Sequence, residues 1–99
     1  MRMPLEVSAT SSFSRISKKF HSRDKAVLDD AIRDVAKDPS IGEEKKGDLA
    51  GVFVYKFKIN NAETLLAYEL LPNKFSPESV VLLAVGPHEN FYDQLKRNI

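Results

Sequence analysis

The most constraining feature of this sequence is a change in the period of its apolar residues at position 52. From there, Phe53, Tyr55, Phe57 and Ile59 alternate with Val52, Val54, Lys56 and Lys58. Alternation at every second position is typical of a β-strand with one buried face. Asn60-Asn61 supplies a turn signal, and the segments 64–71 and 80–85 follow it at short spacing. The second half of the chain therefore predicts three sequential strands in an antiparallel meander.

The first half of the chain has the period of helices. Phe13, Ile16 and Phe20 recur at helical spacing behind residues 10–12, each of which is able to cap a helix. A second helix is predicted after Ser22, and its apolar stripe comprises Val27, Leu28, Ala31, Ile32, Val35 and Ala36. The stripe ends at Asp38-Pro39, because the residue before a proline avoids helical geometry.

Three shorter segments complete the expected fold. Leu5, Val7 and Ala9 alternate with polar residues and predict a short strand with these three side chains on one face. Residues 40–51 are polar and glycine-rich, which predicts a loop. A terminal helix is expected after Gly86-Pro87, where Phe91 and Leu95 stand four residues apart.

The expected order of elements is β-α-α-β-β-β-α, an α+β fold. We expect a helical hairpin packed on a small antiparallel sheet. The continuous apolar run 80–85 predicts a central strand that is covered on both faces. A chain of 99 residues corresponds to one domain, spanning 1–99.

Composition excludes several classes of function. The chain has 15 Lys and Arg against 14 Asp and Glu, so it lacks the strong basic excess of a DNA-coating protein. It has no Cys, which excludes disulfides, a thiol nucleophile and Cys-ligated zinc. Its two histidines are far apart in sequence, so we expect neither a metal nor another cofactor. The longest apolar run is far short of the ~20 residues that span a bilayer. We therefore expect a soluble, cytoplasmic protein that does not contact a membrane.

Two sets of residues are candidates for chemistry. Lys56 and Lys58 share one strand face, which is open if the aromatic face packs on the helices. His88 and Tyr92 are four residues apart, and on a helix they share a face that Lys96 continues. Histidine exchanges a proton near neutral pH, and an aromatic ring can stack on an unpaired base. The alternatives stay open: the lysines also fit a solvated surface, and His88 and Tyr92 also fit structural roles.

Two further charged segments have less specific patterns. The segment 43–48 mixes signs, as a solvated loop does. A basic set near the first predicted helix is suited to phosphates, to an acidic partner or simply to solvent. It consists of Arg15, Lys18, Lys19, Arg23 and Lys25.

Three segments together resemble one known protein family. They are Asp38-Pro39-Ser40-Ile41-Gly42 after the helices, the run from Lys46-Gly47-Asp48-Leu49 through Lys58, and Gly86-Pro87-His88-Glu89-Asn90-Phe91-Tyr92 with the residues to Arg97. This pattern resembles the RelE/ParE superfamily of bacterial type II toxin–antitoxin toxins. The His-Glu-Asn-Phe-Tyr ending is most similar to the ParE-like subgroup. The resemblance spans nearly the whole chain.

The resemblance implies a growth-inhibiting toxin that a small antitoxin neutralises. RelE-type members cleave mRNA in the ribosomal A site, and ParE-type members poison DNA gyrase without nuclease chemistry. For a ribonuclease, the resemblance implies that His88 is a general acid or base, that Tyr92 stacks or positions, and that Lys56 and Lys58 hold phosphate. Lys45 and Lys46, together with Lys96 and Arg97, would extend the RNA contacts. Such a reaction uses no metal.

Two departures from the ribonuclease pattern favour the gyrase alternative. Leu65 stands where many RelE-type members carry an arginine in the middle strand of the meander. No partner for His88 is selected by spacing, although Glu69 and Glu89 are candidates. We expect an mRNA endoribonuclease first and a gyrase inhibitor as the alternative.

The antitoxin that the resemblance implies is expected to be acidic and partly disordered until it binds. The basic residues suggest where it docks. We expect an apolar groove bordered by Lys18, Lys19, Lys56 and Lys58.

Overall fold

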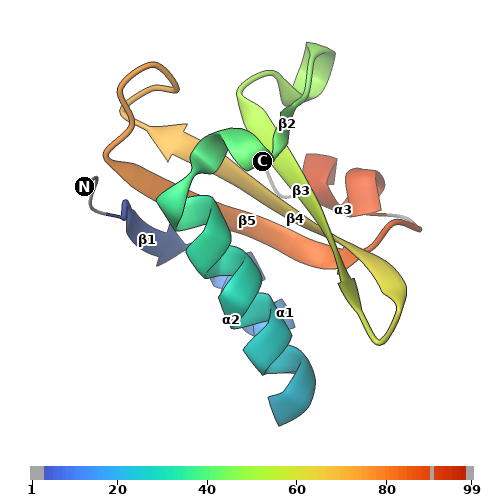
Figure 1. Ribbon diagram of the computed structural model, residues 1–99. Coiled ribbons are helices and arrows are strands. Elements are labelled where there is room, and N and C mark those ends of the chain that lie inside the picture. The colour runs from blue at the N-terminus through green and yellow to red at the C-terminus, as the bar shows by residue number, and fades with distance from the viewer. Residues whose placement is uncertain (1–3, 90, 98–99) are drawn as a thin grey trace.

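A computed structural model describes residues 4–89 and 91–97. Its elements follow in the order β1 (Glu6–Ala9), α1 (Ser11–Ser17), α2 (Ser22–Lys37), β2 (Glu43–Glu44), β3 (Val52–Ile59), β4 (Ala62–Leu71), β5 (Ser79–Pro87) and α3 (Phe91–Arg97). Two short 3₁₀ turns, η1 (Pro39–Ile41) and η2 (Gly47–Leu49), flank β2. The strands form one sheet in the order β1-β5-β4-β3-β2 (Figure 1). The α+β class, the helical hairpin and the antiparallel β3-β4-β5 meander are confirmed.

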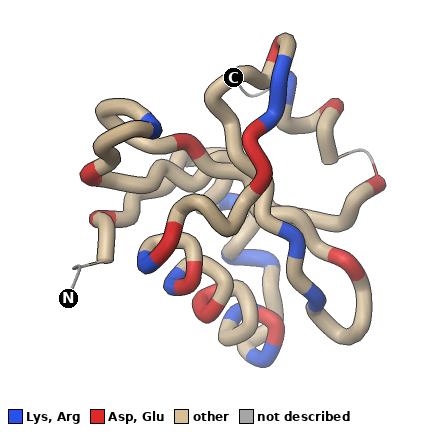
Figure 2. Tube along the Cα trace, turned by 45° about the horizontal axis from the view of Figure 1, so that its top comes forward, with Lys and Arg blue, Asp and Glu red and all other residues tan. Residues whose placement is uncertain are grey.

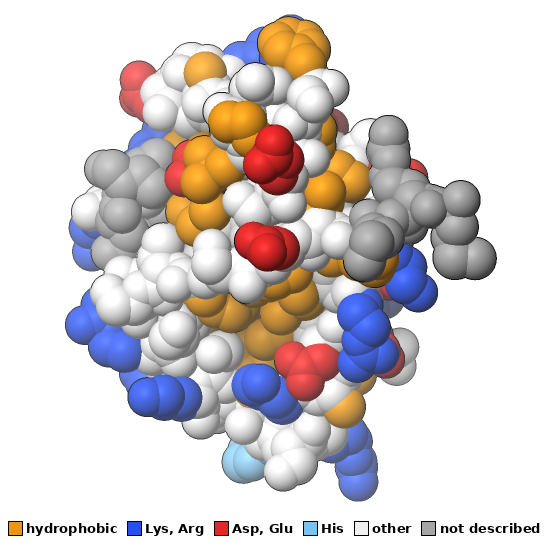
Figure 3. All heavy atoms as spheres, turned by 90° about the vertical axis from the view of Figure 1, so that its left-hand side faces the viewer, with side chains coloured by type: hydrophobic (Ala, Val, Ile, Leu, Met, Phe, Trp, Pro, Cys, Tyr) orange, Lys and Arg blue, Asp and Glu red, His pale blue; other side chains and the backbone are white. Residues whose placement is uncertain are grey.

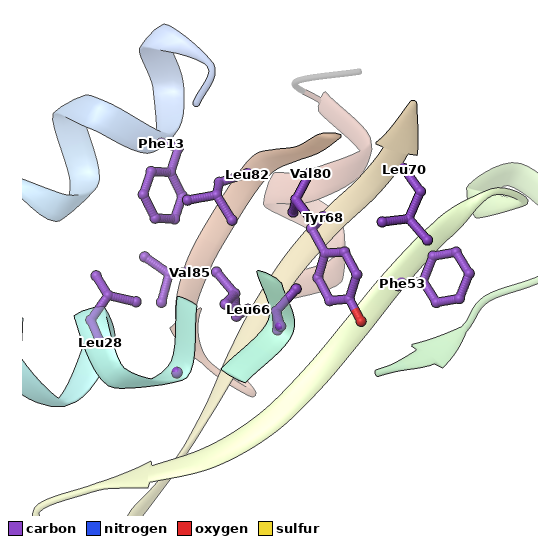
Figure 4. Packing of buried hydrophobic residues seen from close by; sticks show 11 residues of the cluster. Phe13, Leu28, Phe53, Leu66, Tyr68, Leu70, Val80, Leu82 and Val85 are labelled. Atoms are coloured by element: carbon purple, nitrogen blue, oxygen red, sulfur yellow. The ribbon is translucent and has the colours of Figure 1, made fainter. Parts of the chain in front are cut away.

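Helices cover the two faces of the sheet separately. On one face, α1 and α2 contribute Phe13, Leu28 and Val35 to a buried cluster with Leu66 and Tyr68 of β4 (Figure 4). On the opposite face, α3 contributes Phe91 and Leu95 to a second cluster; its sheet members are Val52, Val54, Leu65, Ala67, Leu83 and Ala84. The prediction that the run 80–85 is covered on both faces is confirmed, because its side chains divide between the two clusters.

Local sequence signals set the ends of the predicted helices and the β3–β4 turn. The Thr10 hydroxyl caps α1 by accepting a hydrogen bond from the Phe13 amide at 3.1 Å. The carboxylate of Asp38, just past α2, accepts one from the Ser40 amide at 3.1 Å. Asn60 and Asn61 have φ values of 53° and 65°, the left-handed geometry of a two-residue hairpin turn. The predicted turn at these asparagines is confirmed.

The strand β1 departs from its sequence pattern in two ways. It pairs in parallel with β5, so the sheet is mixed and not purely antiparallel. All four of its residues are exposed, and Val7 does not lie in a buried face. β1 lies at the edge of the sheet, and of the predicted face only Leu5, just before the strand, packs against the cluster beneath α1 and α2. Figure 3 views the molecule from this side, where apolar side chains gather in several surface patches.

The segment 40–51 also differs from the expected loop. Glu43 and Glu44 pair with Val54 and Phe53, which makes β2 an additional edge strand. The Tyr68 side chain of β4 holds this segment in place through two hydrogen bonds. Its hydroxyl donates to the Pro39 carbonyl at 2.6 Å and accepts from the Gly42 amide at 3.1 Å. Tyr68 is fully buried, and burial raises the pKa of its hydroxyl to about 12. A two-residue strand leaves no periodic signal in the sequence, so the pattern missed it.

Within the described residues, no helix is long and apolar enough to cross a membrane.

Candidate functional site

The sheet face beneath α3 carries the candidate lysines. Phe53, Tyr55 and Phe57 pack toward α1 and α2, whereas Val52 and Val54 face α3. Lys56 and Lys58 continue the second row and are exposed. The expectation that both lysines lie on the side away from the helical hairpin is therefore confirmed.

Strand β2 brings another lysine to the same region. The Lys45 ammonium contacts the Glu43 carboxylate at 2.6 Å and lies 5.4 Å from the centroid of the Tyr92 ring. The Lys45 side chain is 21% exposed, while that of Glu43 is 76% exposed. Lys45 is thus a held cation placed over an aromatic ring, a favourable electrostatic arrangement.

Neighbouring charges shift the pKa values of this pair in opposite directions. The hydrogen bond from Lys45, and then its charge, lower the pKa of Glu43, and Lys56 lowers it further. The hydrogen bond to Glu43 raises the pKa of Lys45, with a smaller contribution from Tyr92 and an opposing one from burial. Both groups are therefore charged at neutral pH. Glu43 pairs with Val54, and Lys56 follows two residues later on the same face of β3, so Lys56 lies at the edge of this site.

His88 lies beside Tyr92, but not for the expected reason. The two rings meet edge to face with centroids 5.8 Å apart. The expectation that both belong to one helix is wrong, because β5 extends to Pro87 and α3 begins only at Phe91. The Phe91 amide donates to the His88 carbonyl at 3.2 Å, so His88 forms the turn before α3. Its side chain is exposed and accessible to a substrate.

A shallow cavity of about 300 Å³ joins Tyr92 to more of the predicted RNA-binding residues. Lys45, Lys46 and Lys96 line it together with Tyr92. Asp48 and Leu49 complete its wall. The cavity combines an aromatic ring with three ammonium groups, a combination that suits a nucleotide with its phosphates.

The middle of the sheet carries no cation at this site. Lys56, Leu65 and Gly86 pair across β3, β4 and β5 in one row on the α3 side. Leu65 is fully buried in the cluster beneath α3. The position where many RelE-type toxins carry an arginine is therefore part of the core in this chain.

The four lysines expected to border an antitoxin groove come from two segments, one after α1 and one in β3. Lys18 and Lys19 follow α1 and line a cavity that they share with Arg97. Lys19 also lines a second cavity, together with Ile59 at the end of β3 and Glu63, the β4 partner of Lys58. Lys56 and Lys58 lie on β3, and Figure 2 shows basic and acidic positions interspersed along the helices and strands. None of the described cavities contains lysines of both pairs.

Sequence reasoning missed Glu43 as a site residue. It belonged to a segment of mixed charge that predicts a solvated loop. Its spacing of two from Lys45 was the available signal, since residues two apart in a strand share a face. Among the described residues, the other carboxylates considered for His88 form no hydrogen bond or ion pair with it: Glu69 lies in β4, and Glu89 is exposed in the turn beside it. In the described part of the chain, no three His, Asp or Glu side chains converge as a metal site would require.

A model of a protein family matches residues 7–96: the ParE-like toxin of the type II bacterial toxin–antitoxin system. The match covers most of the chain. The protein belongs to this family. The membership expected from the three sequence segments is thereby confirmed, and the chain is a toxin of RelE/ParE type.

Solved structures of RelE toxins share the fold. The RelBE2 toxin–antitoxin complex from Mycobacterium tuberculosis matches at 25% identity and a TM-score of 0.69, over 87% of this chain and 100% of the other. A double arginine-to-alanine mutant of E. coli RelE in the free state matches at 18% identity and a TM-score of 0.70, over 97% and 94%. The intact E. coli RelBE complex matches at 19% identity and 0.65, over 86% and 98%. No curated protein sequence matches the chain.

Proposed function

We propose that this toxin is a metal-independent, ribosome-dependent mRNA endoribonuclease. The observation that carries the proposal is the contact series His88–Tyr92–Lys45, whose rings and ammonium group lie beside one another next to the open β3 face. A proton-exchanging group, a stacking ring and several cations are the components that RNA cleavage without a metal requires. The RelE fold of the solved neighbours supports the same reaction class by analogy.

The reaction follows from the roles of these groups. The ribose 2′-oxygen attacks the adjacent phosphorus and loses its proton, while the bond to the 5′-oxygen breaks and that oxygen gains a proton. The products are a 2′,3′-cyclic phosphate and a 5′-hydroxyl. His88 exchanges one of these protons. Lys56, Lys58 and Lys45 stabilise the negative charge that builds on the phosphate oxygens, and Tyr92 stacks on a neighbouring base.

The chain contains a matched control for the test of His88. His21, the other histidine, is exposed at the start of α2 and its side chain makes no capping hydrogen bond. After brief induction, primer extension should show new mRNA 5′ ends within translated codons for the wild type and for His21→Ala. His88→Ala should lose these ends by at least about 100-fold, the usual contribution of a general acid or base. Equal cleavage by both variants would remove His88 from the reaction.

A gyrase inhibitor is the second candidate, and burial of Leu65 favours it. An enzyme that stabilises a charged phosphate loses a strong donor when the middle strand offers a core leucine. The match to a ParE-like family model points the same way. In this case purified toxin should inhibit gyrase supercoiling, induced cells should show DNA breaks, and His88→Ala should remain toxic. Normal supercoiling at excess toxin would exclude the candidate.

We also propose that a small acidic antitoxin binds the basic surfaces of this toxin in the cytoplasm. The solved RelBE neighbours are toxin–antitoxin complexes. Because Lys18 and Lys19 follow α1 whereas Lys56 and Lys58 lie on β3, charge reversal should be made in each pair separately. Charge reversal in a pair that contacts the antitoxin should raise the Kd of the toxin–antitoxin complex and weaken the dependence of that Kd on salt. A complex that both reversals leave unchanged would refute this surface assignment.

A further inference from the structure

A second basic surface lies between α1 and α3. The strand β1 pairs with β5 only as far as Leu82, and the chain then leaves the sheet edge to begin α1. The Thr10 amide donates to the Leu82 carbonyl at 3.0 Å and fixes this departure. Between α1 and the last turns of α3, a cavity of about 600 Å³ remains.

Four cations converge on this α1–α3 groove. Arg15 projects from α1, Lys18 and Lys19 follow that helix, and Arg97 ends α3. No carboxylate of a described residue lines the groove. Each of the four side chains is exposed, and none forms an ion pair with any residue in the ranges 4–89 and 91–97. Arg15 has one neutral partner, the Ser12 hydroxyl at 3.3 Å.

Some cations on neighbouring elements are instead held in ion pairs. On α2, Lys25 pairs with Asp29 at 3.5 Å and Arg33 with Asp30 at 3.2 Å. At β2, Lys45 pairs with Glu43. Like charges gathered without a counter-charge repel one another, so the groove is electrostatically complementary to a polyanion.

The helix α3 stands between this groove and the candidate site. Tyr92 and Lys96 face the Lys45 cavity, while Gln94 and Arg97 face α1. A helix is about 10 Å across, which a nucleic-acid strand crosses within two nucleotides. The Lys45 cavity and the groove therefore both border α3, so a strand that crosses this helix contacts both.

We propose that the α1–α3 groove binds the phosphodiester backbone of the RNA strand that occupies the candidate site. This inference rests on the proposed function. The lining suits a phosphate chain better than a docked amphipathic helix, because Ile16 is its only apolar member in the described structure. A docked amphipathic helix needs a row of apolar pockets, and a phosphate backbone needs only charge and hydrogen-bond donors.

The test compares two double variants of the full-length chain. Arg15→Gln/Lys18→Gln removes two groove cations, and Arg33→Gln/Lys37→Gln removes two exposed cations from α2. Binding of a 2′-O-methyl single-stranded RNA, which this reaction cannot cleave, is measured by fluorescence anisotropy over a range of salt. The slope of log K against log salt should fall in magnitude by about 1.4 for the groove variant, since each lost contact contributes about 0.7. The α2 variant should keep the wild-type slope.

The outcomes separate this inference from the proposed function. Equal slopes for the two variants, or no binding of RNA by the wild type, would overturn the groove assignment. A groove variant that binds RNA normally and loses only its antitoxin would overturn it as well, and would assign the groove to an acidic protein segment. Failure of the proposed function would appear elsewhere, as absence of mRNA cleavage by the wild type in cells.

Discussion

At the scale of single residues, the site depends on a cation that another side chain holds in place. The Lys45 side chain has little conformational freedom, because Glu43 binds its ammonium group and the Tyr92 ring lies next to it. An immobilised cation loses less entropy when a phosphate arrives than a free surface lysine does. Glu43 therefore acts as a positioning residue for Lys45.

The Glu43–Lys45 pair makes a prediction about pH. The folded-state pKa of Glu43 lies below the usual 4.5, so its contribution to stability is present above that value and is lost as pH falls through the lowered pKa. Glu43→Gln removes this contribution. Between pH 7 and pH 3, the Tm of the variant should fall by less than the Tm of the wild type, measured by circular dichroism at low salt. A variant that tracks the wild type over this range would show that the pair does not persist in solution.

At the scale of elements, the buried Tyr68 hydroxyl connects the core to the site. Its two hydrogen bonds hold Pro39 and Gly42, and the chain passes from Gly42 directly into β2, which carries Glu43. A Cβ atom at Gly42 would collide with the Tyr68 hydroxyl, so glycine is required for this close approach. The position of Lys45 is thus set by a contact on the opposite face of the sheet.

Tyr68→Phe should destabilise the protein by about 1–3 kcal/mol, since two polar backbone groups lose their partner. Tyr55→Phe is the control, because the Tyr55 ring packs against the same cluster and no hydrogen bond of its hydroxyl is described. Urea unfolding at pH 7 measures both. Equal midpoints for the two variants would contradict this role of Tyr68.

The raised pKa of Tyr68 adds a second signature. Because the folded state holds the phenol proton more tightly, the stabilisation is complete below pH 10 and is lost as pH rises toward about 12. Tyr68→Phe should lack this alkaline component of unfolding, which the wild type and Tyr55→Phe retain.

The sequence predicted those parts of the fold that repeat a local pattern. The apolar stripe of α2 and the alternation of β3 are long enough to be unambiguous. Asn60-Asn61 is a strong turn signal by itself. Three features depend on strand partners that are distant in sequence. They are the parallel pairing of β1 with β5, the two-residue strand β2 and the extension of β5 through Pro87. No local period reports such pairings.

The candidate site divides in the same way. The shared face of Lys56 and Lys58 follows from strand geometry alone, and the structure agrees. His88 and Tyr92 were paired from a helical spacing that the chain does not adopt between them, although their rings do meet. The approach of Lys45 to Tyr92, and of Lys18 to Arg97, joins segments far apart in sequence. Only the three-dimensional structure supplies these pairs.

At the scale of the whole molecule, the helices on the two faces of the sheet differ in length and in how extensively they pack on it. On one face, α2 has 16 residues and packs with α1 on a continuous cluster. On the other, α3 has 7 residues and is anchored by Phe91 and Leu95. A helix this short is unstable by itself and depends on its docking contacts. The site and the α1–α3 groove both use α3, so both depend on the helix that is less extensively packed on the sheet.

This asymmetry predicts different consequences for the same substitution on the two faces. Leu28 of α2 and Leu95 of α3 are each fully buried between their helix and the sheet, on opposite faces. Leu28→Ala should lower the free energy of unfolding by about 2–5 kcal/mol, because the cavity lies in the main core. Leu95→Ala should cost less globally, since the loss cannot exceed the free energy of undocking α3 from a sheet that stays folded.

Hydrogen exchange and RNA cleavage together test this difference. In Leu95→Ala, the amides of α3 should exchange rapidly while those of β4 stay protected, and cleavage should be lost because Tyr92 leaves Lys45. In Leu28→Ala, protection should fall throughout the sheet, while the molecules that remain folded keep their activity. Uniform loss of protection in Leu95→Ala would show instead that α3 and the sheet unfold as one cooperative unit, with the site as stable as the core.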